Sequence, residues 1–208
     1  MTDRIRVVLA THNAHKVEEF QRMLSMASAD VEVVSYDGPE PVEDGVSFAE
    51  NALIKARAAA GHTGLPALAD DSGVCVDVLG GAPGIFSARW AGHHGDAQAN
   101  LELLLDQLSD VRPEHRGAHF RATIALVVPN GDGTYEQTVV DGIWPGRIAE
   151  NARGVNGFGY DPIFIPDGGD LTSAELSAAE KDADSHRARA LNLILPAVRS
   201  LVDDRRSV

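Results

Sequence analysis

The chain has few of the features that mark secreted or membrane-spanning proteins. It contains one cysteine, Cys75, so no intramolecular disulfide can form, which fits a reducing compartment. No apolar run approaches the roughly 20 residues that a membrane helix needs, and the first residues do not resemble a secretion signal. We therefore expect a cytoplasmic protein with no membrane partner.

Positive charge is also scarce. The 208 residues include 18 Lys plus Arg against 31 Asp plus Glu, a formal net charge of −13. Such a surface repels nucleic-acid backbones, so we expect no nucleic-acid partner. A small anionic ligand remains compatible with this charge, because a metal ion and a few local cations can reverse the field inside a cleft.

Length and hydrophobic patterning predict a single domain over residues 1–208 with an α/β fold and a mixed sheet. Strands are expected at residues 4–10, 31–35, 119–128 and 134–143, the last two as a hairpin. Helices are expected from residue 14, from Ser47 to about residue 60, and at 96–108, 174–179 and 185–203. Two short apolar runs, 67–69 and 74–79, flank an acidic segment that reads as the end of a strand.

The segment from Thr11 to Lys16 connects a predicted strand to the start of the predicted helix that follows it. A helix N-terminus offers free backbone N–H groups and a positive dipole end, both suited to phosphate. Thr11 and Asn13 add polar side chains and Lys16 adds a charge. The alternative is an ordinary capped turn with a solvated lysine.

Acidic residues form a second candidate site. Asp71 follows Asp70 in the segment Asp70-Asp71-Ser72-Gly73, and Glu43 precedes the capped helix. Carboxylates are the usual ligands of Mg²⁺, and one of them can also accept a proton from water. The alternative is an acidic turn on an acidic protein.

Two later segments could bind a flat ligand and its polar edge. In residues 156–162, glycines flank Phe158, which lets backbone approach a flat ligand and leaves the ring free to stack. Lys181 and the pair His186-Arg187 place donors near the start of the last helix. The alternatives are a glycine-rich turn and a helix cap with solvated charges.

Taken in order, these segments resemble the inosine triphosphate pyrophosphatase family, whose members act on ITP, dITP and XTP. The stretches that carry the resemblance are residues 9–16, 47–52, 69–73, 80–89, 157–162 and 185–187. The resemblance implies an elongated mixed sheet flanked by helices, in two lobes with a central cleft. It also implies a homodimer, magnesium, and hydrolysis of ITP, dITP and XTP to the nucleoside monophosphate and pyrophosphate.

Residue roles follow from the same resemblance. Asp71 would be the catalytic base close to Mg²⁺, and Glu43 a second metal ligand. Residues 11–16 would hold the triphosphate, and Phe158 would stack on the base. The implied substrate-binding residues are Thr11, His12, Asn13, Ala14, His15, Lys16, Ser72, Phe158, Gly159, Tyr160, Asp161, Lys181, His186 and Arg187, with His12 and His15 contributing backbone alone.

Three other functions stay open at this point. The first is a pyrophosphatase for other damaged or modified nucleotides, including pyrimidines. The second is a nucleotide-binding regulator without turnover, and the third is a structural dimer protein with a vestigial cleft. Asp71, Lys16 and Glu43 are all present, so nothing in the sequence favours a loss of turnover.

Overall fold

The computed structural model describes the backbone of residues 4–27 and 31–206, and their side chains apart from residues 14, 15, 25–27 and 202–206. The strands are β1 (Ile5–Leu9), β2 (Val31–Ser35), β3 (Ala67–Val76), β4 (Gly117–Pro129), β5 (Tyr135–Ile148) and β6 (Phe164–Pro166). They form one sheet in the order β2-β1-β3-β4-β5-β6. Strand β1 pairs in parallel with β2 and β3, whereas β5 and β6 are antiparallel. The predicted α/β fold with a mixed sheet is confirmed.

Five α-helices accompany these strands among the described residues. They are α1 (Ala14–Ala27), α2 (Phe48–Thr63), α3 (Ala97–Gln107), α4 (Ala178–Asp184) and α5 (His186–Arg206). The predicted N-cap of α2 is confirmed, since Ser47 Oγ accepts from the backbone N–H of Glu50. The Glu50 carboxylate accepts from the backbone N–H of Val46. None of these helices is long and apolar enough to cross a membrane.

Two predictions about these elements are wrong. The acidic segment does not end a strand, because β3 continues through Asp70 and Asp71 as one ten-residue strand. The short helix expected at 174–179 instead begins at Ala178, where Ser177 and Glu180 form a capping box. In β3 the two carboxylates find partners on distant segments, which local patterning does not reveal.

The chain divides into two compact units. The first unit comprises residues 1–71, 123–142 and 189–208, and the second comprises residues 72–122 and 143–188. Two units agree with the two lobes that the resemblance implies, whereas the central cleft stays a prediction. The boundary between the units falls inside β3, between Asp71 and Ser72.

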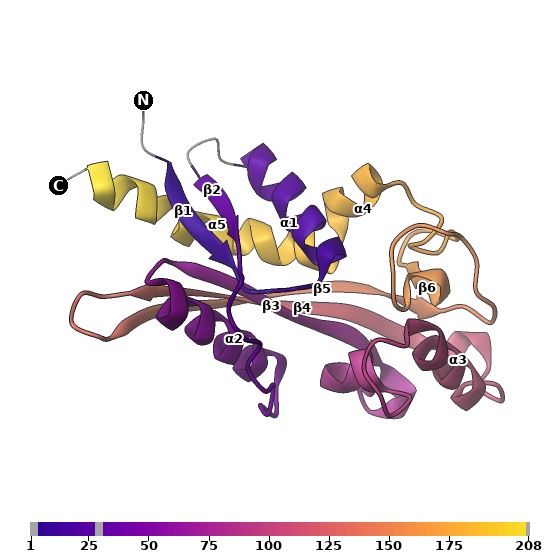
Figure 1. Cartoon of the computed structure of the whole chain (residues 1–208). Helices are drawn as coiled ribbons and strands as arrows, with labels where there is room; N and C mark the ends of the chain where they lie inside the picture. Colours follow the sequence, from indigo (N-terminus) through magenta and orange to yellow (C-terminus); the bar gives the residue numbers. More distant parts are fainter. Residues whose placement is uncertain (1–3, 28–30, 207–208) are drawn as a thin grey trace. The chain divides into compact units, whose positions relative to one another are not determined.

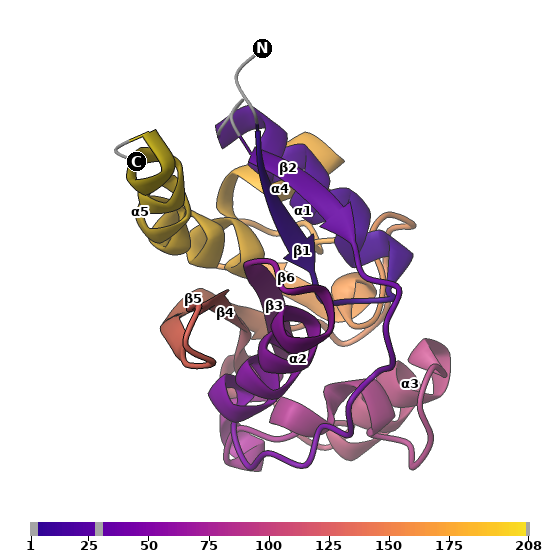
Figure 2. The same cartoon turned by 60° about the vertical axis from the view of Figure 1, so that its left-hand side comes forward.

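In the first unit, the strand order β2-β1-β3 explains where the helices go. The chain passes from β1 through α1 to β2, and then through α2 to β3, on the other side of β1. Because such crossovers between parallel strands are right-handed, α1 and α2 must cover opposite faces of these strands. Figures 1 and 2 show this arrangement.

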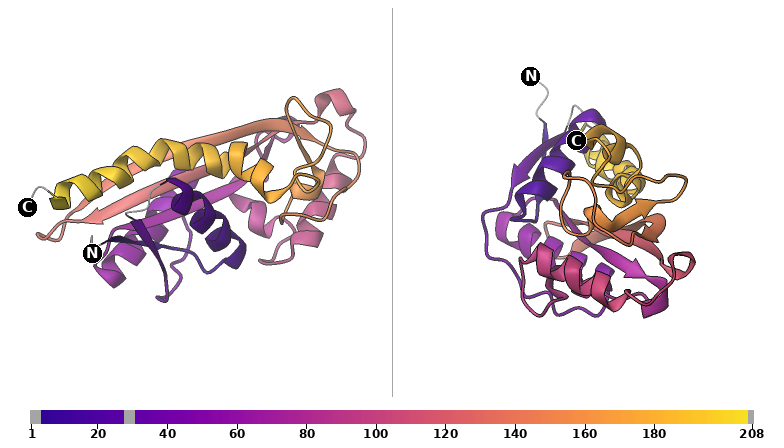
Figure 3. Two further views of the ribbon diagram at one scale, coloured as in Figure 1. Left: turned by 90° about the horizontal axis from the view of Figure 1, so that it is seen from above. Right: turned by 90° about the vertical axis from the view of Figure 1, so that its right-hand side faces the viewer.

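Small residues allow α2 to approach the sheet closely. Its buried face is mostly alanine, and it packs with residues of β1, β3 and β4 in one apolar core. The members of this core are Val8, Ala10, Tyr36, Ala52, Ala56, Ala59, Ala60, Ala67, Ala69, Ala125 and Val127. The predicted hairpin is confirmed, since β4 and β5 are neighbours joined by residues 130–134. Its residues 123–142 belong to this unit, and the part of α5 from Arg189 onward runs alongside them (Figure 3).

The second unit has a core of its own. Its buried members are Val74, Val76, Leu101, Leu104, Leu108, Ala118, Phe120, Trp144, Ile148, Tyr160, Ile163 and Phe164. Arg116 is buried beside it, and its guanidinium donates only to backbone carbonyls in the bonds seen here, those of Val111, Ala149 and Leu108. This arginine therefore ties together three segments of the second unit.

Candidate active site

The reversal of strand order at β1 creates the first candidate site. In parallel sheets, ligands bind beyond the carboxyl ends of the strands at the point where the order reverses. Here β1 leads into the polar loop 11–13, and the backbone N–H of Ala10 bonds to Leu68 in β3. The loop is thereby placed beside Asp70, whose Oδ1 lies 3.2 Å from the Nζ of Lys16, with both side chains largely buried.

The loop itself is held by its own side chains. Thr11 Oγ1 accepts from the backbone N–H of Asn13 at 3.1 Å, and Asn13 Oδ1 accepts from that of Lys16 at 3.3 Å. Asn13 is thus the predicted N-cap of α1. Ala14 and His15 start the helix, and their side chains lie outside the described residues.

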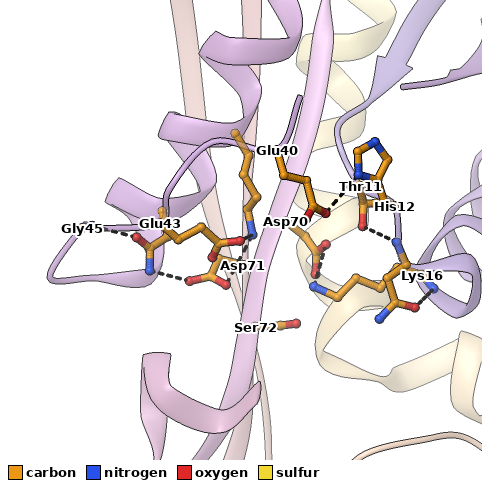
Figure 4. Close-up of polar contacts among 12 residues, drawn as sticks. Thr11, His12, Lys16, Glu40, Glu43, Gly45, Asp70, Asp71 and Ser72 are labelled. Carbon is orange, nitrogen blue, oxygen red and sulfur yellow. Dashed lines mark hydrogen bonds and ion pairs between the residues drawn. The ribbon is translucent and has the colours of Figure 1, made fainter. Parts of the chain in front are cut away.

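His12 has a side-chain role that sequence reasoning did not give it. Its ring stacks on Tyr36, with the centroids 5.6 Å apart, and its Nδ1 lies 3.1 Å from a carboxylate oxygen of Glu40. Glu40 belongs to the loop that also carries Glu43. These contacts fix the polar loop after β1 to the loop before α2 (Figure 4).

Asp71 projects from β3 on the side opposite to Asp70, because consecutive side chains of a strand alternate between its faces. Figure 4 shows the two carboxylates on either side of the strand. Asp71 Oδ2 accepts from Asn51 Nδ2 at 3.1 Å. The Nζ of Lys55 lies 3.5 Å from Asp71 Oδ1 and 3.1 Å from Glu43 Oε1. One ammonium is therefore shared by the two carboxylates that the resemblance assigns to catalysis and metal binding.

Burial and neighbouring charges shift the pKa values in this cluster. Burial first, and then the neighbouring Glu43 carboxylate, raise the pKa of Asp71 above its usual value despite the attraction of Lys55. Burial alone would lower the pKa of Lys55, but the attraction of Asp71, Asp70 and Glu43 raises it. The two shifts therefore differ in their main cause, which is burial for Asp71 and attraction by carboxylates for Lys55.

The donor set of this cluster suits a hard divalent cation. Glu43 and Asp71 offer carboxylate oxygens next to surplus negative charge. No set of three or more His, Cys, Asp and Glu gathers into a metal cluster within the described part of the chain. That is compatible with Mg²⁺, which commonly binds through one or two carboxylates together with substrate phosphates.

The second candidate site lies in the second unit and is organised by Asp161. This carboxylate is 2% exposed. It accepts from Ser173 Oγ, from the backbone N–H of Phe158 at 2.8 Å, and from Lys181 Nζ at 2.6 Å. In the described structure Asp161 thus holds two predicted substrate-binding residues, Phe158 and Lys181, in place.

Phe158 is the centre of this second site. The Nζ of Lys181 and the guanidinium of Arg187 lie 5.4 Å and 5.3 Å from its ring centroid, within the range of cation–π attraction. Arg187 also donates to the predicted substrate residue Ser72, with Nη2 2.8 Å from Oγ. An aromatic ring flanked by fixed donors is suited to stacking on a base and bonding its edge.

The remaining predicted residues of this group support it from the core. His186 is buried and stacks on Phe120, with the ring centroids 4.8 Å apart. Tyr160 is buried and donates its hydroxyl to the carbonyl of Ser87, and burial raises its pKa. Gly159, between Phe158 and Tyr160, has a positive φ of 64°.

Sequence reasoning missed two residues of the first site, Asn51 and Lys55. They are four residues apart on α2, so they share one helix face, and both reach Asp71. The sequence signal that could have indicated them was an amide and a cation on the otherwise alanine-rich face of the predicted helix. Their partner, however, depends on how α2 packs against β3.

Comparisons with known proteins identify a family and several relatives. Residues 7–197 match the model of the Ham1 family. A protein of Leifsonia xyli subsp. xyli named dITP/XTP pyrophosphatase is 65% identical over 197 residues, which cover 95% of this chain and 97% of that protein. A protein of the same name from Streptomyces avermitilis is 54% identical, covering 95% and 98%.

Solved structures show the same relationship. The crystal structure of a nucleoside-triphosphatase and dITP/XTP pyrophosphatase from Mycobacterium abscessus has a TM-score of 0.73 and 52% identity, covering 92% of this chain and 100% of that one. A HAM1 protein from Coxiella burnetii has a TM-score of 0.83 and 39% identity, covering 94% and 99%.

Proposed function

The chain belongs to the Ham1 family, and from this membership we propose that it hydrolyses dITP, XTP and ITP to the nucleoside monophosphate and pyrophosphate. The observation that carries the proposal is the cluster of Glu43, Lys55 and Asp71, together with Lys16, which pairs with Asp70 at the adjacent position of β3. Relatives named dITP/XTP pyrophosphatase cover nearly the whole chain. Residues 1–208 are proposed to act as one pyrophosphatase domain.

Hydrolysis between the α- and β-phosphates needs a water aimed at phosphorus and compensation of the charge on the leaving pyrophosphate. Asp71 accepts the proton of that water. Lys16 and the backbone N–H groups at the start of α1 hold the triphosphate. The ammonium of Lys55 donates to Asp71 Oδ1 and so holds this carboxylate in place.

Glu43 and Asp71 are proposed to hold Mg²⁺. When bound, this ion would neutralise phosphate charge and polarise the reacting groups. Asp71 is thus proposed as both a base and a metal ligand. The protein is further proposed to be a cytoplasmic homodimer.

The second site is proposed to select the base. Phe158 stacks on the purine, with backbone and side chains of residues 158–161 around it. Hypoxanthine and xanthine present a 6-keto acceptor, whereas adenine presents a 6-amino donor. A donor beside Phe158, such as Arg187, would find an acceptor at the 6-position of hypoxanthine or xanthine but a second donor at that of adenine, a mismatch that can be worth several orders of magnitude in rate.

The direct test is pyrophosphate release from dITP, XTP, ITP, ATP and GTP, with Mg²⁺ and with a chelator. Fast release from dITP, XTP and ITP that needs the metal, with ATP and GTP nearly inert, is the expected result. Equal rates on modified pyrimidine nucleotides would favour a broader pyrophosphatase. Binding without release from any of them would favour the regulator.

A further inference from the structure

Asn51 occupies a buried position that an apolar residue would normally take. It lies on the face of α2 that carries Ala52, Ala56 and Ala59, and it is 1% exposed. Its Nδ2 donates to Asp71 Oδ2 at 3.1 Å, and its Oδ1 accepts from the backbone N–H of Gly45 at 2.9 Å. Burying an amide is costly unless it is hydrogen-bonded, and here both ends of the amide have partners.

The two partners require an amide in one orientation. A carboxylate at Asp71 needs a donor, and the N–H of Gly45 needs an acceptor. Only the asparagine orientation with Nδ2 toward Asp71 satisfies both. An aspartate at position 51 would lose the donor, and a leucine would lose the donor and the acceptor together.

Asn51 connects the two carboxylates of the first site through a route separate from Lys55. Gly45 is two residues after Glu43, so the Oδ1 of Asn51 holds the backbone of the loop that carries Glu43. Its Nδ2 holds the side chain of Asp71. The ammonium of Lys55 joins the same two carboxylates directly. Asn51 and Lys55, on one face of α2, therefore each link Asp71 to Glu43 or to the loop that carries it.

We propose that Asn51 is a positioning residue for the hydrolysis, which orients the carboxylate of Asp71 and sets its distance from Glu43. This inference rests on the proposed function. Asn51 does not contact substrate; it acts through Asp71 and the loop. Its loss should therefore reduce turnover and the binding of a divalent cation far more than substrate affinity.

Gly45 gives a second way to disturb the same contact. A Cβ added to Gly45 would lie 2.6 Å from Asn51 Oδ1, 2.7 Å from Glu50 Cβ and 3.1 Å from the backbone N of Asn51, so it would push the loop and the amide apart while residues 51 and 71 stay unchanged. Gly131 provides its matched control, because a Cβ there would meet no heavy atom within 4 Å.

Asn100 provides the matched control for Asn51. It is also a buried helical asparagine, 3% exposed, with both amide ends bonded. Its partners are the backbone N–H of Ala91 and the carbonyl of Ala88, and neither belongs to the candidate sites. Asn100→Leu therefore measures the cost of removing a buried amide alone.

The experiment compares Asn51→Leu and Gly45→Ala with Asn100→Leu and Gly131→Ala. Three quantities are measured: kcat and KM with dITP, the affinity for Mn²⁺ alone by electron paramagnetic resonance, and the Tm. We expect Asn51→Leu and Gly45→Ala to lower kcat and weaken Mn²⁺ binding by about 10- to 100-fold, with KM little changed. Both controls should keep kcat and Mn²⁺ affinity, although Asn100→Leu lowers the Tm.

Unchanged kcat and Mn²⁺ affinity in folded Asn51→Leu, or in Gly45→Ala if the former does not fold, would overturn the positioning role. A rise in KM alone would overturn it as well. A wild-type protein that releases no pyrophosphate would instead refute the proposed function. The Mn²⁺ affinities would then still decide whether Asn51 positions the two carboxylates.

Discussion

Replacing Lys55 with methionine should destabilise the protein in a way that grows with pH. The methionine keeps most of the apolar stem but leaves Glu43 and Asp71 without their shared cation. Breaking a buried ion pair costs about 3–5 kcal/mol, and the side chains of Lys55 and Asp71 are only 13% and 11% exposed. Glu43 is about a third exposed, so its pair adds at most about 1 kcal/mol. We expect a loss of about 4 kcal/mol in the free energy of unfolding near neutral pH.

The pH dependence follows from the raised pKa of Asp71. A carboxyl whose pKa is higher in the folded than in the unfolded protein stabilises the fold at low pH, and this contribution is lost as the pH rises through the folded-state pKa. Without Lys55 the pKa rises further, so the variant loses more stability on the alkaline side. On acidification Asp71 becomes protonated, and the difference from wild type should shrink.

Urea denaturation in the presence of a chelator, at about pH 5 and about pH 8, measures this difference. Arg57→Met is the control, because Arg57 is an exposed cation on the same helix. A destabilisation of Lys55→Met that is the same at both pH values, or no larger than that of the control, would refute the reasoning.

Four further outcomes are expected. Asp71→Asn should abolish pyrophosphate release but keep dITP binding, measured by turnover and by thermal shift; near-normal turnover would contradict the assignment of the base. Phe158→Ala should raise the KM for dITP about tenfold, since stacking on a base is worth about 1–3 kcal/mol, whereas an unchanged KM would exclude stacking. Gly157→Ala should weaken selection of dITP over dATP, because Gly157 has a φ of +74° and an added Cβ would overlap the Asp161 carboxylate; the ratio of kcat/KM values tests this. Arg116→Met should lower the free energy of unfolding by about 3 kcal/mol, since three backbone carbonyls lose their donor; a loss below about 1 kcal/mol in urea denaturation would argue against it.

The α/β fold was predictable because the signals for its elements are local. Apolar runs located β1 and β2, and Ser47 with Glu50 marked the start of α2. The same capping-box pattern at Ser177 and Glu180 could have placed α4 correctly, but the helix-favouring residues 174–176 before it suggested an earlier start. Local signals that compete with each other therefore account for that error.

The break predicted in β3 has a different origin. Two adjacent acids inside a strand look like a turn when only neighbouring residues are considered. In the fold they point to opposite faces, where Lys16 meets Asp70 and Lys55 meets Asp71. These two lysines come from different helices, and no sequence spacing indicates which lysine pairs with which aspartate. Asn51 escaped prediction for the same reason.

The division of the chain also bears on how the protein is made. The second unit is complete once residue 188 has been synthesised, whereas the first still needs residues 189–208. The contacts that complete the first unit can therefore form only after the residues of the second unit have been synthesised. The contacts of Asp71 with Asn51 and Lys55, in contrast, lie entirely within the opening segment.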